Sequence, residues 1–128
     1  MSAAPTPLRP RVLIADAAPL TRWALERAFA SEGFETCTVS GCEELLEHVL
    51  QRRDSLIVSA SRFDDDDVMP VLRRIAHASP DLRVIVLGGP DDGASGDAPA
   101  NLIVVEQPFS VADLLRIANS AAATARSA

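Results

Sequence analysis

The feature that most constrains this chain is an alternation of two apolar patterns that begins at Arg11. Short continuous apolar runs alternate with longer segments in which apolar residues recur every three or four positions. The first pattern is typical of buried strands and the second of amphipathic helices, and their alternation is expected of βα units around a parallel sheet. The predicted strands are RVLIAD (11–16), FETCTV (34–39), LIVSA (56–60), RVIVLG (83–88) and NLIVVE (101–106).

Helix signals fill most of the gaps between these strands. Pro19 suits the first turn of one helix, and Ser40 with Glu43 three residues later is typical of a capping box at the start of the next. A third helix should stop near Pro80, and Ser110 should open the last. The stripes predicted to be buried are Leu20, Trp23, Ala24, Ala28 and Phe29; Leu45, Leu46, Val49 and Leu50; Val68, Leu72, Ile75 and Ala76; and Leu114, Leu115 and Ala118.

One helix that the alternation calls for has no signal in the sequence. The segment GGPDDGASGDAPA (88–100) holds four Gly, two Pro and three Asp in thirteen residues. Gly and Pro cost a helix roughly 1 and 3 kcal/mol per residue relative to Ala. We therefore expect the fourth helix to be shortened or lost.

These elements predict an α/β fold, a flavodoxin-like, doubly wound parallel sheet of five strands in the order 2-1-3-4-5. The length of 128 residues suits one domain with one core. We expect a flexible segment at 1–10, the domain at 11–122 and a tail at 123–128. In this fold class sites collect at the carboxyl ends of the strands.

Composition argues against several classes of function. The formal net charge is -6 and every basic residue is Arg, so the chain lacks the clustered positive charge that nucleic-acid binding needs. No apolar run reaches the roughly 20 residues of a membrane span, and we expect a cytoplasmic protein. Cys37 and Cys42 lack CxxC spacing and are expected to be reduced, partly buried thiols. His48 and His77 show no ligand spacing, and we expect no metal and no cofactor.

Several segments together resemble a known family. They are RVLIADAAPLTRWALERAFASEGFE at the start, LIVSASRF in the middle, RVIVLGG, and VVEQPFSVADLL near the end. In this order and spacing they resemble the receiver domains of bacterial two-component response regulators, over residues 11 to about 122. The resemblance implies a phosphorylation switch at the carboxyl ends of the strands, and partner or dimer contacts on the face formed by the family's fourth helix, fifth strand and fifth helix.

The residues that carry the family's switch are mostly replaced. Family members have an acidic pair, a phosphoacceptor Asp, a Ser or Thr, a Lys and an aromatic switch residue. The positions of this sequence that match them are Asp16 and Ala17 for the acidic pair, Ala60 for the acceptor, Gly88 for the hydroxyl, Gln107 for the Lys and Val104 for the aromatic residue. Only Asp16 keeps the family's residue type.

Ala60 removes the nucleophilic oxygen that phosphoryl transfer requires. With two of three carboxylates lost, Mg²⁺ would have little ligation beside Asp16. Gln107 keeps polarity without leaving an unpaired cation in a pocket stripped of carboxylates. We therefore interpret the chain as a degenerate receiver whose pocket has been neutralised.

The loop after Ala60 carries further candidates. Arg62 is hypothesised to reach Asp16, where the metal would sit. Asp64 and Asp65 are candidate rim contacts, and the run from Asp64 to Asp67 is expected to be a solvated loop whose last Asp caps a helix. An acceptor relocated to Ser61 or to this run is the alternative.

The sequence thus predicts a non-enzymatic, phosphorylation-independent receiver-like domain that acts by protein-protein interaction. We expect it to be a single-domain adaptor or inhibitor whose partner is a histidine kinase, another regulator or an output protein. Homodimerisation through the face described above is a further expectation, with partner choice rebuilt in residues 88–100. Besides the relocated acceptor, a small α/β enzyme or small-molecule binder that uses the cleft at the strand ends remains an alternative.

Overall fold

A computed structural model describes residues 10–51, 54–63, 65–89 and 99–127. Its centre is a parallel sheet of five strands in the order β2-β1-β3-β6-β7. The strands are β1 (Arg11–Ala15), β2 (Glu35–Val39), β3 (Leu56–Ala60), β6 (Arg83–Gly88) and β7 (Leu102–Glu106). The predicted fold and strand order are confirmed, with each strand within one residue of its predicted bounds.

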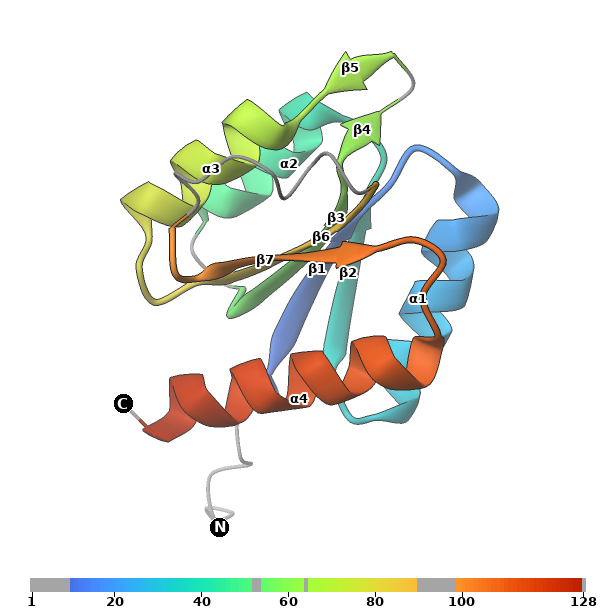
Figure 1. The fold of residues 1–128 in the computed structure, drawn as a ribbon, viewed down its shortest axis with the longest axis vertical. Coiled ribbons are helices and arrows are strands. Elements are labelled where there is room, and N and C mark those ends of the chain that lie inside the picture. The colour runs from blue at the N-terminus through green and yellow to red at the C-terminus, as the bar shows by residue number, and fades with distance from the viewer. Residues whose placement is uncertain (1–9, 52–53, 64, 90–98, 128) are drawn as a thin grey trace, which may run out of the picture.

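Helices cover both faces of this sheet (Figure 1). The helices α2 (Cys42–Leu50) and α3 (Met69–Ala78) lie on one face, and α1 (Pro19–Ser31) and α4 (Val111–Ser127) lie on the other. None of these helices, among the residues that the structure describes, is long and apolar enough to cross a bilayer. The helix α4 continues to Ser127, so the expected tail at 123–128 is helical as far as that residue.

The sheet separates two apolar cores because successive residues of a strand point to opposite faces. In β1, Leu13 and Ala15 pack toward α2 and α3, whereas Val12 and Ile14 pack toward α1 and α4. All four side chains are at most 1% exposed. This burial on both faces explains the continuous apolar run that marked the strand in the sequence.

Two of the predicted helical stripes are confirmed, and two are partly wrong. The four stripe residues of α3 are buried, as are Leu114 and Ala118 of α4. In α1 the buried residues are Leu25 and Phe29, whereas Leu20 is 77% and Trp23 is 56% exposed. Trp23 instead packs under the Arg27 guanidinium, 5.0 Å from the ring centroid. The three- and four-residue spacing that placed Leu20 and Trp23 in the buried stripe was therefore misleading.

The predicted stripe and cap of α2 need the same kind of correction. Leu45 is buried, but Leu46 is 41% and Leu50 is 80% exposed. The capping box is absent, because the extended Gly41 is the N-cap residue and the helix begins one residue later than the box requires. The Ser40 hydroxyl donates to Glu44 Oε1 at 3.2 Å instead.

A short antiparallel hairpin that the sequence did not predict follows β3. It pairs β4 (Arg62–Phe63) with β5 (Asp66–Asp67). The chain then enters α3, where Asp67 Oδ1 accepts a hydrogen bond from Met69 N at 3.0 Å. Asp67 is not the N-cap residue, which is Val68, but its carboxylate still bonds an N–H at the start of the helix, so the predicted cap is displaced by one residue. The segment in which the fourth helix was expected to be lost lies mostly outside the described residues, which here are non-helical at Gly89 and Pro99–Asn101.

Candidate functional site

The predicted pocket positions come together at the carboxyl end of the sheet. Ala15 pairs with Ser59 in the register of β1 and β3, so Asp16 and Ala60 are the next residues on neighbouring strands. On the other side, Gly88 pairs with Glu106, and Gln107 N donates a hydrogen bond to Gly88 O at 2.9 Å. This edge is where the fold class places its sites.

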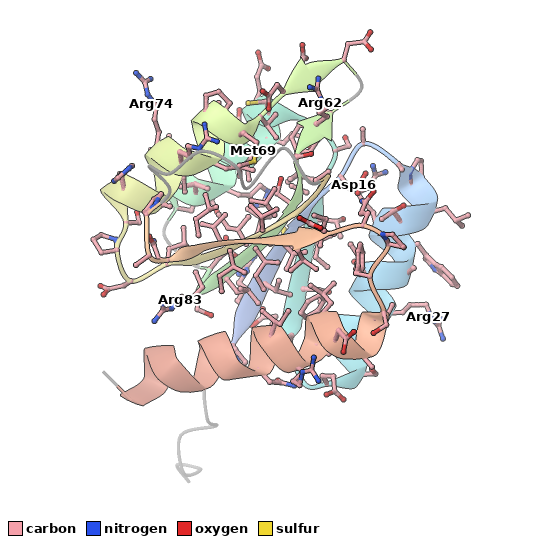
Figure 2. All side chains as sticks on the ribbon, in the orientation of Figure 1. Asp16, Arg27, Arg62, Met69, Arg74 and Arg83 are labelled. Atoms are coloured by element: carbon pink, nitrogen blue, oxygen red, sulfur yellow. The ribbon has the colours of Figure 1, made fainter. Side chains whose placement is uncertain are left out.

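Asp16 takes part in the turn between β1 and α1 (Figure 2). Its Oδ1 accepts a hydrogen bond from Ala18 N at 2.9 Å, and its backbone N–H donates to Val39 O at 3.2 Å. The carboxylate is half-buried and satisfies a backbone donor just before the helix, which is a common role for Asp in turns. The described residues contain no group of three or more His, Cys, Asp or Glu side chains that could hold a metal ion.

A cation that the sequence did not single out lies over this turn. Arg22, in the first turns of α1, donates from Nη1 to Asp16 O at 2.7 Å and to Ala17 O at 3.2 Å. These charge-assisted bonds fix the loop between β1 and α1. A basic residue six positions after the strand-end Asp is the only signal in the sequence, and it does not reveal that the side chain turns back onto carbonyl groups.

The hypothesis that Arg62 reaches Asp16 is wrong in this structure. Arg62 is exposed on β4 and pairs through its backbone with Asp67, and Figure 2 shows its side chain away from Asp16. Within the described ranges, the ion pairs are Arg11 with Asp54 and Arg116 with Asp113. The positive group at the strand-end turn is therefore Arg22.

The residues around Ala60 are occupied by structural contacts. Ala60 is half-buried and packs against the core of the α2 and α3 face. Ser59 is fully buried, and its hydroxyl donates to Ala60 O at 2.8 Å. Ser61 is 8% exposed, and its backbone bonds to Leu87 O and Val68 N. A relocated acceptor has little access at either Ser.

Two of the remaining predicted positions, Val104 and Gln107, carry no charge. Val104, the position predicted to match the family's aromatic residue, is half-buried and packs against the core that α2 and α3 cover. Gln107 is exposed and precedes Pro108 across a cis peptide bond. Asp65 is exposed, and Asp64 lies outside the described residues.

The structure also brings together two residues that the sequence treated separately. Cys37 on β2 and His48 on α2 approach to 3.6 Å between Sγ and Nδ1. Both side chains are half-buried, and Cys37 and Cys42 are free thiols as predicted. The sequence spacing of these two residues, eleven positions, gave no sign of this contact, which forms because a strand and the helix after it bring them together.

Comparison with known proteins shows the fold. No family model matches the chain, and no curated protein matches its sequence. Among solved structures, the signal receiver domain of an HD domain-containing protein from Pseudomonas fluorescens Pf-5 superposes with a TM-score of 0.83 at 19% identity, over 94% of this chain and 100% of that one. A CheY-like receiver domain protein from Methanospirillum hungatei JF-1 gives 0.81 at 18% identity, over 94% and 100%.

A response regulator from Thermotoga maritima gives a TM-score of 0.73 at 24% identity, over 89% of this chain and 98% of that one. Sequence identities this low support a shared backbone fold, but they do not support shared roles for individual residues. The chain therefore has the fold of response regulator receiver domains.

Proposed function

We propose that this chain is a receiver-like signalling domain that works without phosphorylation, by contact with a protein partner, and that it is not an enzyme. Ala60 is the observation that carries the proposal. It occupies the end of β3, next to the strand-end Asp16, and a methyl group cannot accept a phosphoryl group. Asp16 and Arg22 meanwhile hold the neighbouring turn through hydrogen bonds to its backbone, so a metal would have to compete with an existing cation there.

The relocated-acceptor alternative has less support. Asp67 already accepts a backbone hydrogen bond at the start of α3, and Asp65 and Asp66 are exposed on the hairpin. Exposed carboxylates on a hairpin are surrounded by water and not by the fixed donors that stabilise a transferring phosphoryl group. Ser61 is buried and lies in the backbone ladder.

We propose that partner contact uses the face formed by β7 and α4. Ile103 on the edge strand β7 is 39% exposed, and Val111 at the start of α4 is 43% exposed. These two side chains lie on elements to which the resemblance to receiver domains assigns partner contacts. The partner would be a kinase, another regulator or an output protein, for which the chain would act as an adaptor or inhibitor, or a second copy of the chain.

Intact mass measurement after incubation with Mg²⁺ and acetyl phosphate tests the first half of the proposal. We expect no phosphoprotein, and a stable phosphoryl adduct would refute it. Crosslinking from a photoreactive residue at Ile103, with one at Glu26 on α1 as the matched control, tests the second half. Products from Ile103 only, in the same yield with and without acetyl phosphate, are expected. An equal yield of crosslinked products from Glu26 would mean that partner contact is not specific to the β7 and α4 face.

A further inference from the structure

The pair of Cys37 and His48 lies at the border of the central sheet. Cys37 is on β2, which has a neighbouring strand on one side only, and its side chain packs toward the face that α2 covers. His48 is in the last turn of α2. Both residues are half-buried, so each keeps some surface in contact with solvent. The pair is therefore at the rim of the core and not inside it.

The sulfur of Cys37 is close to both nitrogens of the imidazole ring. Sγ lies 3.6 Å from Nδ1 and 3.9 Å from Nε2 of His48. In the neutral ring, the nitrogen without a hydrogen can accept the proton of the thiol. A thiol becomes a strong nucleophile when it loses this proton, and a neighbouring His is a common base for that step. The contact therefore places a nucleophile beside a base.

The charged groups around the pair are of both signs. The charge of the Asp54 carboxylate interacts with that of His48, so it would stabilise the imidazolium that proton transfer creates. Arg11 forms an ion pair with Asp54 at 3.3 Å and offsets part of this effect. The exposed Glu35 on β2 and Glu44 on α2 add negative charge. Because these charges oppose one another, the direct contact of thiol and imidazole is the feature that distinguishes this site.

The second thiol of the chain offers an internal comparison. Cys42 is the first residue of α2 and is also half-buried. Within the part of the chain that the structure describes, its sulfur makes no hydrogen bond. The start of a helix can itself favour a thiolate, so Cys42 is a demanding reference. The two thiols differ in that Cys37 alone is in contact with a His side chain.

We propose that Cys37 is a modification site for small disulfides, with His48 as the base that accepts its proton. Sγ of Cys37 attacks one sulfur of the disulfide, so that a new S–S bond forms and the old one breaks. The leaving sulfur takes the proton from His48 and departs as a thiol. The Cys37 sulfur is oxidised and the leaving sulfur is reduced, so no further oxidant is needed. This chemistry does not depend on Ala60 or on the proposed signalling function.

Reaction with hydroxyethyl disulfide tests the proposal, because this probe is neutral and the surrounding charges have little effect on its approach. The variants Cys42→Ser and Cys37→Ser each keep a single thiol, whose mixed disulfide is measured by intact mass after an acid quench. In Cys42→Ser, adding His48→Gln should slow the modification of Cys37 by at least about tenfold, because a positioned base typically contributes more than that. In Cys37→Ser, the same change should leave the rate at Cys42 unchanged.

An unchanged or higher rate at Cys37 in His48→Gln would overturn the proposal, since looser packing alone would raise access to the thiol. A second measurement needs no change at His48. It compares the rate at Cys37 in Cys42→Ser between the folded chain and the chain unfolded in urea. Cys37 should react faster in the folded chain, because the imidazole contact exists only there, whereas burial without a base slows a thiol. An equal or faster reaction in urea would also overturn the proposal, and this comparison still decides if His48→Gln fails to fold.

Discussion

The two edges of the central sheet hold their polar groups in different ways. At the carboxyl edge, Asp16 accepts one backbone hydrogen bond, and Ala60 and Gly88 offer no side-chain chemistry. At the amino edge, Arg11 and Asp54 form a partly buried ion pair, and the two N–H groups of the Asn101 side chain are shared among three backbone carbonyls. Perturbation at the amino edge should therefore cost stability, whereas perturbation at the carboxyl edge should reveal whether any switch remains.

The largest effect that we expect comes from Asn101, which precedes β7. Its Nδ2 donates to Ala76 O at 2.9 Å, Ser79 O at 3.1 Å and Leu82 O at 2.7 Å. Asn101→Ala should lower the free energy of unfolding by about 3 kcal/mol, because buried carbonyl groups lose their donor. Chemical denaturation measures this value. The control is Asn119→Ala, because the exposed side chain of Asn119 makes one hydrogen bond of 3.4 Å, to Glu32. An equally large loss of stability in Asn119→Ala would contradict the account.

The ion pair at the amino edge should respond asymmetrically. Arg11→Ala leaves a carboxylate that is 5% exposed without its cation, whereas Asp54→Asn leaves an Arg that water can reach. We expect Arg11→Ala to cost about 2 kcal/mol, more than Asp54→Asn, because an uncompensated buried charge dominates the loss. The exposed pair of Arg116 and Asp113 is the control, and Arg116→Ala should cost under about 0.5 kcal/mol. Equal costs for Arg11→Ala and Asp54→Asn would mean that burial does not govern this pair.

A smaller effect should follow from restoring acidic groups at the carboxyl edge. The double variant Ala17→Asp with Ala60→Asp gathers three carboxylates with Asp16 and should lose about 1 kcal/mol through like-charge repulsion. Saturating Mg²⁺ should restore the lost stability, because the ion binds only the folded state. Thermal unfolding with and without Mg²⁺ measures both effects. Mg²⁺ should not stabilise the wild type, nor a control double variant at two exposed positions of α1, Ala24→Asp with Ala30→Asp. Stabilisation of either protein would mean that Mg²⁺ binds outside the carboxyl edge.

The smallest effect concerns pH and Asp54. Because burial raises the pKa of this carboxyl above 3.8, the folded state binds the proton more tightly than the unfolded state. The corresponding stability is fully present below 3.8 and is lost as the pH rises through the raised pKa. Relative to Asp54→Asn, the wild type should therefore gain stability as the pH falls from about 7 to about 4. A difference that is flat over this range, in denaturation at several pH values, would mean that Asp54 keeps its ordinary pKa.

The sequence predicted the sheet better than it predicted the helices. Buried parallel strands such as β3 are apolar on both faces, so their bounds follow from composition alone. The faces of α1 and α2 were partly misassigned because Trp23, Leu46 and Leu50 are large apolar residues that remain exposed. Burial of a helix face depends on what packs against it, and that information is not local.

The candidate sites divide in the same way. The resemblance to receiver domains singled out Asp16, Ala60, Gly88 and Gln107, and the predicted strands placed them at one edge because the carboxyl ends of parallel strands meet there. Arg22 could not be placed, because its bonds go to backbone carbonyls that carry no residue-type signal. A cavity at the amino edge could not be predicted from the sequence either, because its lining residues Val49, Asp54 and Leu82 come together only in the folded chain.

The central claim is that the carboxyl edge no longer senses phosphorylation. Amide NMR of the full chain, titrated with Mg²⁺ and then with beryllofluoride as a phosphoryl mimic, tests it most directly. We predict no shifts at Asp16, Ala60, Ser61, Gly88 or Gln107 at either step, with the double acidic variant at positions 17 and 60 as the control that should respond to Mg²⁺. Saturable shifts at these residues in the wild type would show that the edge still binds the mimic, and would contradict a phosphorylation-independent function.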